Sequence, residues 1–155
     1  MTKRDSVAWM SDSHKIEAWS ADRLTDPDVA KVSGQAPWVP SILDKMSSLA
    51  DLPEGWDGCG SRAIQPLSIE TMLRVLRVID SEAGPAPHMS PISGGALQIE
   101  WSHGDRDLEI ATRSDGSLQY VKTQDGAEDE MEDGSLSSSD EEKLRHLMRW
   151  LIDGR

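Results

Sequence analysis

The chain has 155 residues, and 28 acidic against 16 basic side chains give it a formal net charge of −12. This charge repels phosphates and anionic lipid, so we expect neither direct nucleic-acid binding nor membrane contact. We expect a protein partner, and the charge is compatible with a basic one. The single cysteine, Cys59, cannot form an internal disulfide, and no apolar run marks a membrane span or a signal peptide, which favours a cytoplasmic protein.

Residues 1–37 show only weak periodicity, and we expect them to form a mostly irregular, flexible N-terminal arm. Trp9, Trp19 and Trp38 carry large apolar rings, which favours packing of one or two of them on the domain. The alternative is an arm that offers these indoles to a partner as aromatic anchors.

The first predicted element is an amphipathic helix over about residues 40–51. Apolar side chains recur there at i, i+3, i+4 and i+7, the spacing of one helix face. Pro40 suits the first turn, because its missing N–H is not needed there, and Pro53 stops the helix.

A turn punctuated by three glycines follows at residues 52–61. Glycines adopt positive φ readily, which predicts a tightly folded backbone, and Asp57 can cap its own turn through an Asx hydrogen bond. The functional alternatives are ligand or metal binding by Glu54 and Asp57, or a nucleophilic Cys59. We favour a packed corner, in which Trp56 is buried between the helices and the sheet.

A second amphipathic helix begins at Pro66 or Ser68 and runs to about Ser81, with a broad apolar stripe facing the core. The glycine and prolines of residues 84–87 end it and predict an extended connector. His88 belongs to that connector and is expected at the surface.

Three segments between residues 94 and 122 alternate apolar and polar side chains, the period of half-buried strands. The turn at residues 114–117 contains the Asp-Gly pair typical of tight hairpins. We predict a three-stranded antiparallel meander with one apolar and one polar face. The polar face carries Glu100 and Glu109, with His103 in the adjoining turn; we favour an ordinary solvated face over acid–base chemistry there.

Nine acidic and no basic residues lie between positions 123 and 142. Charge repulsion and the scarcity of apolar side chains predict a disordered acidic loop at residues 123–138. Ser139 and Glu142 then have the spacing of a capping box. They open an amphipathic helix over residues 139–153, which either closes over the domain, as we favour, or docks on another protein.

The fold class is therefore α+β, a small three-stranded meander packed against two to three amphipathic helices. The expected organisation is an N-terminal arm at 1–37, a core domain at 38–122, an acidic loop at 123–138 and a C-terminal helix at 139–153.

Three segments carry a family resemblance: LPEGWDG at 52–58, GALQIEW at 95–101 and DLEI at 107–110. Together they resemble an uncharacterised family of small bacterial proteins with an LPxGWDGYGA turn followed by a GGxQxEW…LEI…DG antiparallel sheet. The resemblance covers about residues 40–122 and implies a bacterial origin and a shared domain, but no particular activity. Cys59 stands where the family has tyrosine, and Ser61 where it has alanine, which argues against a catalytic role for position 59.

Three functions remain as hypotheses. The favoured one is a non-enzymatic protein-binding accessory or neutralising partner in a bacterial or mobile-element system. The second is a small ligand-binding protein or enzyme that uses the Trp56-Asp57 turn and the polar sheet face. The third is an acidic nucleic-acid mimic that inhibits a DNA- or RNA-binding protein through residues 125–142. We assign no catalytic residue, metal or cofactor, and the candidate binding residues are Trp56, Asp57, Glu100, His103, Glu109 and Trp150.

Overall fold

The computed structural model describes residues 36–79, 84–126 and 131–155. Its elements, in chain order, are α3 (Val39–Ala50), α4 (Pro66–Ile79), β1 (His88–Ile92), β2 (Ala96–His103), β3 (Arg106–Thr112), β4 (Ser117–Gln124), β5 (Met131–Ser137) and α5 (Glu141–Asp153). Most of the expected N-terminal arm, with Trp9 and Trp19, lies outside the described residues. Trp38 is described and is buried, 9% exposed.

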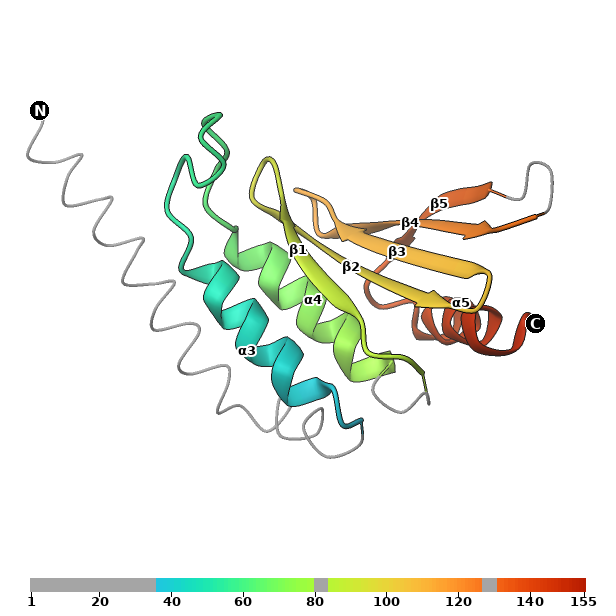
Figure 1. The fold of residues 1–155 in the computed structure, drawn as a ribbon. Helices are drawn as coiled ribbons and strands as arrows, with labels where there is room; N and C mark the ends of the chain where they lie inside the picture. The colour runs from blue at the N-terminus through green and yellow to red at the C-terminus, as the bar shows by residue number, and fades with distance from the viewer. Residues whose placement is uncertain (1–35, 80–83, 127–130) are drawn as a thin grey trace, which may run out of the picture.

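The strands form one antiparallel sheet in the order β1-β2-β3-β4-β5, each paired with its neighbours in sequence (Figure 1). This arrangement confirms the α+β class, and β2, β3 and β4 are the three predicted strands. The prediction of a three-stranded sheet is wrong, because the chain adds one further strand at each edge.

β1 lies in the segment that the sequence indicated as a connector running through His88. The sequence signal for a strand is weak here, because Met89 is the only fully buried side chain of β1 and Pro91 has no N–H to donate. An edge strand tolerates such a proline, since its missing donor does not interrupt a ladder on both sides. Met89 pairs with Ile99, which places it in the core.

β5 corrects the prediction of a disordered loop at residues 123–138. β4 runs on to Gln124, and residues 131–137 pair with it along their whole length; residues 127–130 lie outside the described part. The strand was missed because Leu136 is its only buried side chain. The tertiary structure also offsets its charge, since Lys122 Nζ lies 2.8 Å from Glu132 Oε2.

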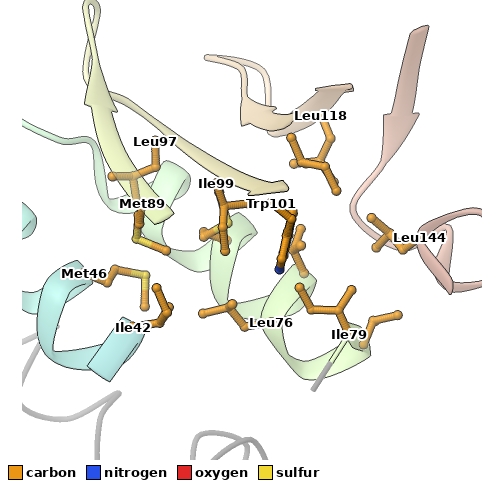
Figure 2. Close-up of a cluster of buried hydrophobic side chains, with 14 of the residues drawn as sticks. Ile42, Met46, Leu76, Ile79, Met89, Leu97, Ile99, Trp101, Leu118 and Leu144 are labelled. Atoms are coloured by element: carbon orange, nitrogen blue, oxygen red, sulfur yellow. The ribbon is translucent and has the colours of Figure 1, made fainter. Parts of the chain in front are cut away.

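The described helices all pack on one face of the sheet (Figure 1). The strands bury side chains of one parity against them: Met89, Leu97, Ile99, Trp101, Leu108, Ile110, Leu118, Tyr120 and Leu136. Figure 2 shows this core, to which α3 contributes Ile42 and Met46, α4 contributes Leu76 and Ile79, and α5 contributes Leu144. The observed bounds of α3 agree with the predicted helix to within one residue.

α5 closes over the domain, as its apolar stripe predicted, and its four buried residues are Leu144, Leu147, Met148 and Leu151. Its N-cap is Asp140, whose Oδ1 accepts a hydrogen bond from Lys143 N at 3.2 Å. The predicted capping box of Ser139 and Glu142 is therefore wrong. Ser139 Oγ is instead hydrogen-bonded to Ser137 Oγ at 2.8 Å, within the turn that leaves β5.

The C-terminal end of α5 is attached to the sheet by Arg106. Its Nη1 donates to the carbonyl oxygens of Trp150 and Leu151, at 2.8 and 2.9 Å. Trp150 O also accepts from Gly154 N at 2.8 Å, so the guanidinium adds a second donor there, supplies a donor to Leu151 O and complements the helix dipole. Gly154 then ends the helix with a φ of 75°, as predicted.

Candidate functional site

The turn at residues 52–61 is a hydrogen-bonded corner. Asp57 Oδ1 accepts from the N–H groups of Cys59 (2.9 Å) and Ser61 (3.1 Å), and Asp57 Oδ2 accepts from Ser61 Oγ at 2.5 Å. These hydrogen bonds hold the pKa of the Asp57 carboxyl below its ordinary value, and the one from Ser61 Oγ has the largest effect. Ser61 is buried, and its Oγ is also hydrogen-bonded to Ser93 Oγ at 3.1 Å, so the corner is tied to the β1–β2 turn. Both oxygens of Asp57 thus serve the fold.

Gly95 makes the second attachment between this corner and the sheet. Its carbonyl oxygen accepts from Gln65 N at 2.9 Å, and its φ is 81°. A Cβ at this position would lie 2.6 Å from Ala63 O, closer than real Cβ atoms approach backbone. Only glycine allows the two segments to touch in this conformation.

Trp56 is half-buried and does not belong to the hydrophobic core. Its Nε1 donates to Arg62 O at 3.1 Å, within the same turn. The predicted burial of this indole between the helices and the sheet is therefore wrong. Tight backbone hydrogen bonds, such as Trp56 N to Pro53 O, keep Trp56 at the corner, and Ile64 enters the core from this connection instead.

The sheet face opposite the helices carries a polar surface, which we call the open face. Its side chains form three rows across the strands: Ser90, Gln98, Ala111, Gln119 and Ser135; His88, Glu100, Glu109, Val121 and Asp133; and Ser102, Asp107, Thr123 and Met131. All of them are exposed or half-exposed. No described helix covers this face.

Glu100 and Glu109 lie directly opposite each other at the centre of the open face. Gln98 Nε2 lies 3.5 Å from Glu100 Oε2 and 3.4 Å from Glu109 Oε2, so one amide bridges the two carboxylates. Like charges directly opposite on neighbouring strands are destabilising. We therefore expect this carboxylate pair to cost stability rather than to support the fold.

The strands carry two basic side chains of the lysine or arginine type, Arg106 and Lys122, and both lie on the helix side. Arg106 binds the end of α5, and Lys122 binds Glu132 and lies 5.0 Å from the centre of the Trp150 ring. The described strands thus contribute four carboxylates to the open face, from Glu100, Asp107, Glu109 and Asp133, and no lysine or arginine.

Two predicted site residues do not join this surface. His103 lies three positions from Glu100 on β2, so the two side chains leave opposite sides of the strand. Trp150 packs at the margin of the core, with Lys122 Nζ over its ring, so this indole contributes to the fold and not to the open face. Glu100 and Glu109 are brought together, while Trp56 and Asp57 stay in the separate corner.

Sequence reasoning did not single out Asp107 and Asp133 as site residues. Asp107 precedes Glu109 by two positions, so strand parity alone places it on the same face; its Oδ1 accepts from Ser102 Oγ at 2.5 Å. Asp133 could not be found in this way, because β5 was not predicted.

Across residues 36–79, 84–126 and 131–155, no three His, Cys, Asp or Glu side chains come together as a metal site would require. In the same part of the chain, no helix has the length and hydrophobicity needed to cross a membrane.

Comparison with known proteins adds no relative. No family model matches the chain, and no curated protein or solved structure shows significant similarity to it.

Proposed function

We propose that this chain is a non-enzymatic protein-binding module, an accessory or neutralising partner in a bacterial or mobile-element system, that docks a basic protein on the open face. The observation that supports this function is the separation of charge across the sheet. Arg106 and Lys122 lie beneath the sheet, while the four carboxylates stand on the open face. The bacterial setting rests on the family resemblance of residues 40–122.

The charge pattern favours a cationic partner for a physical reason. Glu100 and Glu109 oppose each other with only Gln98 between them, so the isolated domain bears their repulsion. A lysine or arginine of a partner would convert this repulsion into attraction and would raise the association rate through long-range steering. Acidic partners and nucleic acids would be rejected by the same field.

An enzyme or small-ligand binder has less support from the geometry. Asp57 is engaged by Cys59 and Ser61, and His103 leaves the strand on the side opposite Glu100. The candidate groups therefore do not converge on one point, as acid–base catalysis requires.

The test is purification of the tagged chain from the organism that encodes it, at low and high salt. We expect a basic protein to co-purify at low salt and to be released as the salt concentration rises, because rim and surface ion pairs are screened. The double variant Glu100→Gln/Glu109→Gln should reduce capture of that protein.

The matched control is Asp44→Asn/Glu54→Gln, which removes the same charge from exposed positions outside the sheet. If both double variants lose capture of the partner equally, the loss is caused by the change in net charge and not by the open face. A chain that elutes alone under every condition would contradict the proposed function, and capture of a DNA- or RNA-binding protein through residues 125–142 would favour nucleic-acid mimicry instead.

A further inference from the structure

We propose that the outer edge of β5 accepts an extended basic segment of the partner as a sixth antiparallel or parallel strand. This inference rests on the proposed function and names the mode of docking. An open sheet edge presents unpaired N–H and C=O groups, and addition of a peptide strand satisfies them.

The two edges of the sheet differ in their availability. β1 contains Pro91, which cannot donate a hydrogen bond, and α3 packs against that strand. β5 contains no proline over Met131–Ser137, and its neighbour within the described chain is β4 alone. An antiparallel strand directs about half of its backbone groups to each side, so β5 keeps a set of donors and acceptors for a further strand.

β5 is also held in place before any partner arrives. Tyr120 Oη donates to Glu132 Oε1 at 2.9 Å, and Lys122 Nζ lies 2.8 Å from Glu132 Oε2. Gly134 lies directly against the Tyr120 ring, and Leu136 is buried in the core. A preformed edge lowers the entropy cost of association, because only the incoming strand must be ordered.

The charge of β5 selects the occupant. Lys122 compensates Glu132 on the helix side, whereas Asp133 is exposed on the open face, at the end of the row that contains Glu100 and Glu109. A strand with lysine or arginine at every second position would place its cations beside Asp133. A second copy of this chain is disfavoured, because each copy carries a net charge of −12. Met131, 66% exposed, offers an apolar contact at the end of the edge.

The probe is a fluorescent peptide of alternating lysine and threonine, roughly ten residues long, the upper length of an ordinary strand. Its control has the same sequence and charge but carries an N-methyl group on every amide, which removes the N–H donors of both edges and so prevents strand pairing in either direction. Binding is followed by fluorescence anisotropy, and the amide hydrogen exchange of β5 is followed by NMR. We expect the unmethylated peptide to bind about tenfold or more tightly than its control and to slow the exchange of β5 amides.

Asp133→Lys should weaken peptide binding, while Asp44→Lys on the exposed side of α3 serves as the matched control and should weaken it less. The inference is overturned if the two peptides bind with equal affinity, or if the peptide slows amide exchange elsewhere than in β5. It is also overturned if the peptide does not bind at millimolar concentration. If Glu100→Gln/Glu109→Gln abolishes capture of the partner while the β5 edge shows none of these effects, the inference fails and the proposed function stands. If no partner is captured at all, the proposed function itself fails.

Discussion

Asp57 shows how one carboxylate can resemble a site in sequence and act as structure. Its two oxygens accept from two backbone N–H groups and one buried hydroxyl, and the hydroxyl of Ser61 connects the turn to Ser93. The Ser61 hydroxyl is the group that the corner shares with the β1–β2 turn, so its removal would break both the hydrogen bond to Asp57 and the hydrogen bond to Ser93. At the residue scale, the corner is best tested by its pH dependence.

We predict that Asp57→Asn lowers the melting temperature at neutral pH and reduces the loss of stability on acidification. The pKa of Asp57 is lowered in the folded chain, chiefly by Ser61 Oγ. Its contribution is therefore fully present above the pKa of an unfolded aspartate and is lost as the pH falls through the lower folded value. Thermal unfolding measured across acidic and neutral pH checks this prediction.

The control is Glu54→Gln in the same turn, which removes a similar charge from an exposed side chain. It should lower the melting temperature at neutral pH less than Asp57→Asn does. If the stability of Asp57→Asn falls on acidification as steeply as that of the wild type, the Asp57 carboxylate does not carry the pH dependence.

At the scale of the element, β5 depends on one close contact. Gly134 lies opposite Tyr120, and a Cβ at position 134 would lie 2.8 Å from the Tyr120 ring and hydroxyl. The ring is held by its hydrogen bond to Glu132, and burial, with that hydrogen bond, raises the pKa of Tyr120. Glycine at this position therefore lets a buried aromatic ring cover the edge strand.

We predict that Gly134→Ala costs about 1–3 kcal/mol in the free energy of unfolding, because the Tyr120 ring must move in a packed site. Urea denaturation measures this cost. Tyr120 is the single tyrosine of the chain, so an absorbance titration reads its pKa without interference from another phenol. We expect that pKa to fall towards its ordinary value in the variant.

Ser135→Ala is the matched control, since Ser135 adjoins Gly134 on the strand but lies on the open face. We expect Ser135→Ala to leave the pKa of Tyr120 where it is in the wild type. It should also change the free energy of unfolding much less than Gly134→Ala does. Equal costs for the two variants would show that β5 is sensitive to side-chain changes in general and that the Tyr120 contact does not carry the effect.

At the scale of the whole molecule, the helices and strands sort charge between the two sides of one sheet. The helix side pairs its charges, as Lys122 does with Glu132, while the open face leaves Glu100 and Glu109 opposite each other. Groups that reduce stability are commonly retained at functional surfaces, where a partner relieves the strain. The open face should therefore trade stability against binding.

We predict that Glu100→Gln/Glu109→Gln stabilises the isolated domain by about 0.2–1 kcal/mol, since it removes a like-charge cross-strand pair. Chemical denaturation at low salt checks this, and added salt should reduce the gain because it screens the repulsion. Asp44→Asn/Glu54→Gln is again the control for net charge. A destabilised Glu100→Gln/Glu109→Gln variant would mean that the carboxylates support the fold, which would remove the argument for a functional surface.

Much of the fold could be predicted because local patterns were strong. The apolar stripes of α3, α4 and α5 and the alternation around Ile99, Ile110 and Leu118 each identify an element without knowledge of its neighbours. The edge strands were missed for the opposite reason. β1 and β5 each bury a single side chain, and their remaining residues read as connector and acidic loop.

The sequence by itself determined the α+β class, the central hairpins and the apolar face of each helix, because these depend on periodicity within a short segment. Only the tertiary structure decided the place of Trp56, the two edge strands and the separation of charge across the sheet. Each of these depends on contacts between distant segments, such as Lys122 with Glu132 or Ser61 with Ser93. The open face, on which the proposed function rests, is for this reason a property of the folded sheet and of no single stretch of sequence.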